Sequence, residues 1–154
     1  MKTGHADKAR ELFNDGYNCS QAVFGAFSED AGLDMKTALR FASPFGGGMG
    51  RMREVCGGVS GMFMVLGLFF GYDEPDDAQA KKELYSYVRA LADKFKESEG
   101  SIICRELLAG VKTQPGPNPE DRNTADYKKR PCPKLVAYAA QLVEDFLNEH
   151  GKLE

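Results

Sequence analysis

The stretch that decides the fold runs from residue 45 to residue 72 and reads FGGGMGRMREVCGGVSGMFMVLGLFFGY. Its second part, residues 55–72, is uncharged for 18 residues and has the length of a helix. Five glycines lie in this part, and each weakens a helix interior by roughly 1 kcal/mol relative to alanine. The run also lacks aromatic and basic belts at its two ends, which membrane spans usually carry. We therefore predict a buried central helix whose glycines allow close packing or the approach of a bound group.

The glycines fall into two sets. Those in residues 46–50 suit a loop whose backbone takes positive φ or lies against another group. This run resembles a phosphate cradle, but it lacks the Lys-Ser/Thr of a P-loop and follows no strand, so a tight turn is the simpler interpretation. In the helix, Gly57 and Gly61 are one turn apart, as are Gly67 and Gly71. They form a shallow strip at which a cofactor or another helix could lie, and we expect a homodimer through it.

Composition limits the kind of protein. The chain has 154 residues, 42% hydrophobic and 28% charged, with a net charge of -3, which fits one soluble domain. The absence of a basic excess argues against nucleic acid as a partner. The first six residues lack the apolar core of a signal peptide, so we expect a cytoplasmic protein without a membrane span. Four cysteines in that reducing compartment indicate metal binding or redox chemistry more often than structural disulfides.

Helical periodicity accounts for most of the remaining chain. Capping residues and apolar spacing predict helices at residues 6–15, 19–27, 34–43, 56–72, 76–98, 102–108 and 134–148. Residues 111–131 are rich in proline, asparagine and charge, and we expect a long ordered loop with at most one helical turn near residues 119–122. No segment reads as a strand. The sequence therefore predicts an all-α fold, a single-domain helical bundle spanning residues 1–154 around the central helix.

The four cysteines share one kind of position. Cys19, Cys56, Cys104 and Cys132 each fall at the start of a predicted helix. Free amides and the positive end of the helix dipole favour thiolate there, so we predict a lowered pKa for every one of them. Their separations of 37, 48 and 28 residues contain no C-x-x-C motif, so the fold would have to gather them.

Several chemistries could use such thiols. Four cysteines complete a tetrahedral zinc site or hold an iron–sulfur cluster. A dithiol–disulfide pair is a second interpretation, and four small buried side chains without chemistry are a third. His5 and His150 lie near the two ends, where we expect them to be solvated, so a Cys–His nucleophilic pair has no support. The chain also has no haem-attachment motif.

The order of the motifs resembles a known family. The motifs are YNCSQA at residues 17–22, GGGMG at 46–50, CGGVSG at 56–61, ICREL at 103–107 and the later lone Cys132. They are similar to those of the C-GCAxxG-C-C family of redox-active proteins over about residues 8–147. Gly58 stands where that family usually has alanine.

The resemblance implies a redox role, often near oxidoreductases or transporters. It also implies a relation to split-Soret cytochromes, whose equivalent domain is associated with an iron–sulfur centre. Because no haem motif is present, no haem function is expected here.

We thus expect a redox protein with a four-cysteine iron–sulfur or zinc site, used in electron transfer or redox sensing with a redox partner protein or oxidoreductase. The alternatives are a metal-free thiol oxidoreductase that uses Cys56 with another cysteine, and a non-catalytic helical adaptor. The candidate metal-binding or catalytic residues are Cys19, Cys56, Cys104 and Cys132. The candidate cofactor-binding residues are Gly46, Gly47, Gly48, Gly57, Arg53 and Arg105.

Overall fold

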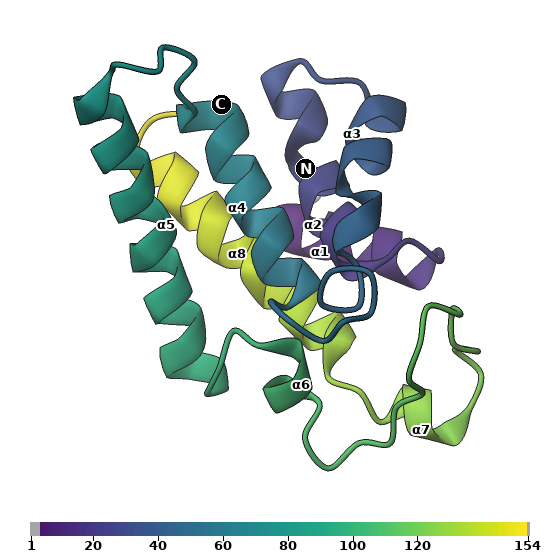
Figure 1. Cartoon of the computed structure of the whole chain (residues 1–154). Helices are drawn as coiled ribbons and strands as arrows, with labels where there is room; N and C mark the ends of the chain where they lie inside the picture. The colour runs from purple at the N-terminus through teal and green to yellow at the C-terminus, as the bar shows by residue number, and fades with distance from the viewer. Residues whose placement is uncertain (1–3, 154) are drawn as a thin grey trace.

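The computed structural model describes residues 4–153, and its regular structure is helical (Figure 1). The elements are α1 (His5–Asn14), α2 (Cys19–Ser28), η1 (Glu29–Ala31), α3 (Met35–Ala42), η2 (Ser43–Phe45), α4 (Gly57–Phe70), α5 (Ala78–Glu99), α6 (Cys104–Leu107), α7 (Ala125–Lys128) and α8 (Cys132–Glu149). Within these residues the extended pairing is limited to one antiparallel bridge between Val55 and Ile103. The predicted all-α class is confirmed.

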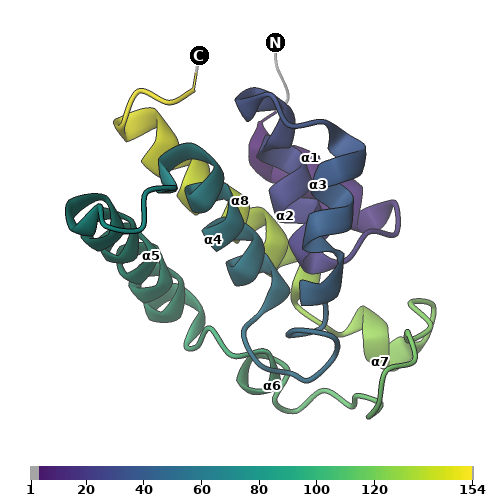
Figure 2. The same cartoon turned by 45° about the horizontal axis from the view of Figure 1, so that its top comes forward.

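Helix α4 lies at the centre of the molecule, as the apolar run predicts. It packs against α2, α8 and α5, while α1 packs against α2 and α8 (Figures 1 and 2). Val59, Met62, Val65 and Leu66 of α4 are fully buried. No helix in the described part of the chain combines the length and apolarity needed to cross a membrane.

The glycines at the start of α4 allow α2 to approach closely. A Cβ placed on Gly61 would lie 2.9 Å from both the Ser20 carbonyl oxygen and the Val23 Cβ. One placed on Gly57 would lie 2.9 Å from the Cys19 Cβ. The half of the strip formed by Gly57 and Gly61 is therefore covered by α2 of the same chain. Gly67 is exposed with open space beside it, and the homodimer expected through the strip stays a prediction.

Local capping signals place several helix starts correctly. The Asn18 side chain accepts a hydrogen bond from the Gln21 amide, and the Gln21 side chain accepts one from the Asn18 amide, forming a capping box at α2. Asp34 and Asp77 cap α3 and α5 in the same way, each accepting from an amide three residues on. With these caps, α2 begins at the predicted residue, α3 one residue later and α5 two residues later than predicted.

Other starts differ from the prediction: α5 begins at Ala78 rather than residue 76, and α8 begins at Cys132 rather than residue 134. Helix α6 begins at Cys104 rather than residue 102, because residues 102–104 pair with the segment around Val55. Ser101 accepts a hydrogen bond from the Ile103 amide but does not cap α6. In residues 111–131 the helical turn lies at α7 rather than near residues 119–122, because Thr124 caps it by accepting from the Tyr127 amide.

His5 is packed, so the expectation that it is solvated is wrong, whereas His150 is exposed, as expected. The imidazole of His5 stacks on Phe27 and lies 2.6 Å from a Glu144 carboxylate oxygen. That of His150 stacks on Phe146.

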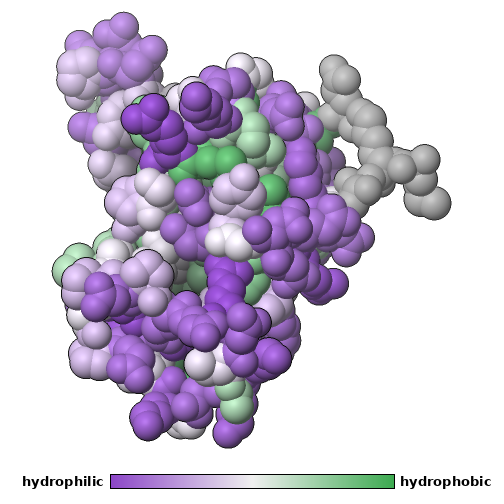
Figure 3. Space-filling view, turned by 90° about the vertical axis from the view of Figure 1, so that its right-hand side faces the viewer, coloured by the Kyte–Doolittle hydropathy of each residue, from purple (hydrophilic) through white to green (hydrophobic). Residues whose placement is uncertain are grey.

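One side of the molecule presents mostly hydrophilic side chains, with hydrophobic residues confined to small areas (Figure 3).

Candidate functional site

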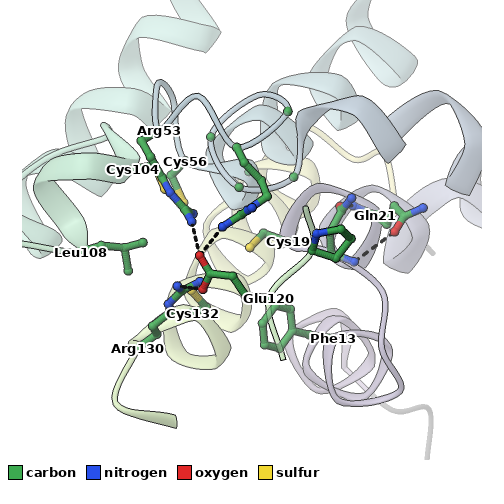
Figure 4. A pocket seen from close by; sticks show the side chains of 18 of the residues that line it. Phe13, Cys19, Gln21, Arg53, Cys56, Cys104, Leu108, Glu120, Arg130 and Cys132 are labelled. Carbon is green, nitrogen blue, oxygen red and sulfur yellow. Dashed lines mark hydrogen bonds and ion pairs between the residues drawn. The ribbon is translucent and has the colours of Figure 1, made fainter. Parts of the chain in front are cut away.

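The four cysteines line one cavity of about 710 Å³. Cys19, Cys104 and Cys132 are the first residues of α2, α6 and α8, and Cys56 is the N-cap of α4. The predicted position of each cysteine at a helix start is confirmed. The cavity therefore lies where these helix starts meet, and residues of the long loop also line it (Figure 4).

A short backbone ladder places Cys56 and Cys104 on the same wall of the cavity. The Cys56 amide donates to the Ile102 carbonyl at 2.8 Å, and the Cys104 amide donates to the Glu54 carbonyl at 2.5 Å. Gly48, at φ 72°, passes behind this wall, where an added Cβ would lie 2.6 Å from the Cys104 Cβ. Because Gly48 has no side chain, the backbone of the glycine-rich loop can lie directly against Cys104.

Cys19 and Cys132 form the other side. Their thiols shift each other's pKa, and both residues are partly exposed, whereas Cys56 and Cys104 are buried. All four are free thiols. Across residues 4–153, no three Cys, His, Asp or Glu side chains stand close enough together to hold a metal ion. The four thiols share the lining of one cavity.

Three arginines converge on one carboxylate at the edge of the cavity. Glu120 Oε1 accepts from Arg51 and, at 2.9 Å, from Arg53, and Oε2 accepts from Arg130. The side chains are between 6% and 15% exposed, so the charges are largely removed from water. Arg53 also points at Cys104, with Nη1 3.9 Å from the sulfur. Figure 4 shows Arg53 and Arg130 directed at Glu120 between the cysteines.

The thiols differ in acidity, which corrects the prediction that every pKa is lowered. A hydrogen bond from Cys19 lowers the pKa of Cys132, helped by Arg130 and Arg53, and raises the pKa of Cys19. Burial raises the pKa of Cys56 to about 12 and also raises that of Cys104. For three of the four thiols, therefore, other effects outweigh the favourable helix start.

The other candidate residues are divided between cavity and surface. Gly46, Gly47, Gly48, Gly57 and Arg53 line the cavity. Arg105 instead points to the surface, where it pairs with Glu54 at 2.5 Å. The amides of residues 49–54 donate to carbonyls of residues 44–49 within the loop, so they are not free to cradle a phosphate.

Sequence reasoning missed Glu120 as part of the site. It lies in a segment without periodicity, and its partners are 69, 67 and 10 residues away in the chain. The sequence indicates only weakly that Arg51 and Arg130 belong to the site, because each lies close in sequence to a cysteine. Nothing in the sequence links them to one carboxylate.

Comparison with models of protein families identifies the family of this chain. The model of the family described as "Putative redox-active protein (C_GCAxxG_C_C)" matches residues 17–146. The chain belongs to this family. The matched part of this C_GCAxxG_C_C protein contains all four cysteines and the three arginines around Glu120. No curated protein and no solved structure matches the chain.

Proposed function

We propose that this redox-active protein carries electrons, or senses redox state, through an iron–sulfur cluster held by Cys19, Cys56, Cys104 and Cys132. The observation that carries the proposal is the meeting of four thiols, from four helix starts, around one cavity. Thiolates are the usual protein ligands of such clusters, and the set needs no further donor.

A single zinc ion draws its four ligands onto one atom. In an iron–sulfur cluster the cysteines bind different iron atoms, so the ligands stand around a larger object. All four cysteines line a cavity of about 710 Å³, which has room for such an object. On that ground we favour a cluster over the zinc ion that the sequence also allowed.

Charge supports the same proposal. Three buried guanidinium groups face a single carboxylate, which leaves positive charge in excess at the cavity. The Nε of Arg130 is buried and has no hydrogen-bond partner. Buried charge and unpaired donors are costly unless something compensates them. A centre ligated by four thiolates is anionic and would offset this excess.

The chain's own residues would hold and tune such a centre. A bound cluster supplies a group that accepts and releases one electron at a time. The Arg53 side chain donates towards Cys104, and hydrogen bonds to ligand sulfurs raise the reduction potential of a centre. Phe13, Leu108 and Leu135 add buried apolar side chains to the cavity wall and limit access of water.

Anaerobic purification tests the proposal. The wild-type protein should be coloured and contain iron and acid-labile sulfide in equal amounts. Cys104→Ser should lose most of both, whereas Arg105→Gln changes the adjacent residue at the surface and should keep them. A folded wild-type protein without iron or sulfide, after reconstitution with ferrous iron and sulfide, would contradict the proposal.

A second function is favoured by the contact between Cys132 and Cys19. Cys132 combines a lowered pKa, partial exposure and nearby arginines, which are the marks of a reactive cysteine. Its thiolate could attack a partner disulfide and release one thiolate. Cys19 would then lose its proton to the released partner thiolate and attack the Cys132 sulfur, which releases the second partner thiolate and leaves a Cys19–Cys132 disulfide. The partner disulfide gains the two electrons that the pair loses.

Mass spectrometry distinguishes this function from the first. Iron-free reduced protein treated with glutathione disulfide should form the Cys19–Cys132 disulfide, and Cys19→Ser should accumulate one glutathione on Cys132. Cys132→Ser is the matched control and should react slowly. Glutathione appearing on Cys56 or Cys104 first would refute this assignment.

A further inference from the structure

Among residues 4–153, Glu120 is the carboxylate that pairs with Arg51, Arg53 and Arg130. Besides the three guanidinium groups, its Oε1 accepts a hydrogen bond from the Gln114 amide at 3.1 Å. Its side chain is 11% exposed. Burial alone would raise the pKa of Glu120, but the Gln114 amide, Arg130 and Arg51 outweigh burial and lower the pKa. Glu120 is therefore held as an anion inside the protein.

Two of the three arginines also act on the cysteines. Arg53 directs one guanidinium nitrogen to Glu120 and another to the Cys104 sulfur. Arg53 and Arg130 both favour the thiolate of Cys132. These two guanidinium groups thus interact with the Glu120 carboxylate and with the sulfurs. A change in the charge of the cysteine sulfurs must therefore alter the strength of the ion pairs between these arginines and Glu120.

Glu120 belongs to the segment 111–124, which lies outside the helices and is mostly exposed. Polar contacts hold this segment in place. Arg51 donates to the carbonyls of Gln114, Gly116 and Asn118, and Arg122 donates to carbonyls of the α1–α2 turn. Segments with few buried apolar contacts open at low free-energy cost. The position of this segment therefore depends strongly on the arginine–Glu120 contacts.

We propose that Glu120 couples the position of segment 111–124 to the charge of the cysteine centre. When the centre gains one electron from a reductant, its added negative charge competes for Arg53 and Arg130. The contacts of Glu120 weaken and the segment loosens, with no bond of the chain broken and no proton transferred. Because coupling is reciprocal, the Glu120 carboxylate lowers the reduction potential of the centre. This inference rests on the proposed redox function.

Redox titration of the iron-loaded protein tests the coupling. Glu120→Gln removes one negative charge near the centre, so the reduced form should be favoured at least tenfold, which is about 59 mV for a one-electron couple. Glu120→Asp keeps the charge and should stay near the wild-type potential. Asp121→Asn is the matched control, because Asp121 is exposed and accepts from the Asn123 amide, so its charge is screened by water.

Hydrogen exchange gives a second readout. Amides of residues 111–124 should exchange faster in dithionite-reduced wild-type protein than in the oxidised protein, and fast in both states of Glu120→Gln. Protein that loads no iron would overturn both the function and this inference. Loaded Glu120→Gln with an unchanged potential, or exchange that is the same in both redox states of the wild type, would overturn the inference alone.

Discussion

Cys132 and Cys56 occupy the same kind of position, at the start of a long helix, yet their thiols differ in acidity. The helix dipole favours a thiolate by roughly 0.3–1 kcal/mol. Burial shifts a pKa by up to several units, and each unit corresponds to about 1.36 kcal/mol. Burial therefore decides the pKa of Cys56. Cys132 is partly exposed, and Cys19, Arg130 and Arg53 reverse the effect of its burial.

Alkylation should reveal this difference. In the reduced, iron-free chain, iodoacetamide should modify Cys132 first at pH 7–8, because its lowered pKa gives more thiolate there. Cys56, with a pKa of about 12 and 6% exposure, should react last. Peptide mapping after short reaction times measures the order. Equal rates at all four cysteines would show that the arginines do not tune them.

Glu120 should make the protein sensitive to acid. Its pKa is lowered in the folded state, so its stabilising effect is present above the ordinary carboxyl pKa of about 4.3 and is lost as pH falls through the folded value. The free energy of unfolding of wild type should exceed that of Glu120→Gln at pH 6, and the gap should shrink towards pH 3. Urea denaturation at both pH values measures this gap. A gap that stays constant with pH would mean that the Glu120 charge contributes nothing.

At the scale of the elements, prediction succeeded where the signal is local. The caps at Asn18, Asp34 and Asp77 act within three residues, so sequence alone places the starts of α2, α3 and α5 to within two residues. The start of α6 depends on pairing between residues 102–104 and the segment around Val55. That pairing joins segments almost 50 residues apart, and capping patterns carry no information about it.

Two glycines of α4 that are neighbours in the motif should respond oppositely to alanine. Gly61→Ala would place a Cβ 2.9 Å from Ser20 and Val23 of α2, so the helices must separate, at a cost of about 1–3 kcal/mol. Gly58→Ala meets Ala139 at 3.7 Å, an ordinary contact, and should stabilise by up to about 1 kcal/mol through helix propensity. Urea denaturation of both variants checks the signs. Equal stabilisation by both would show that α2 and α4 are not closely packed at Gly61.

At the scale of the whole molecule, the fold class and the positions of the cysteines could be predicted, but the composition of the site could not. Periodicity and caps identify the helices, and the cysteine positions follow from them. That four cysteines separated by 37, 48 and 28 residues line one cavity is a property of the packed helices. The Glu120 contacts likewise exist only once segment 111–124 lies against the glycine-rich loop.

The central claim is that the four cysteines act together as ligands of one centre, and counting reactive thiols tests it most directly. Anaerobic wild-type protein is alkylated before and after its iron is removed by a chelator, and intact mass gives the number of modified cysteines. We predict that all four are protected in the loaded protein and that, once the iron is gone and alkylation is run to completion, all four react, with Cys132 first and Cys56 last. Four thiols that react without iron removal, or two that react only after a reductant is added, would contradict a single four-cysteine centre.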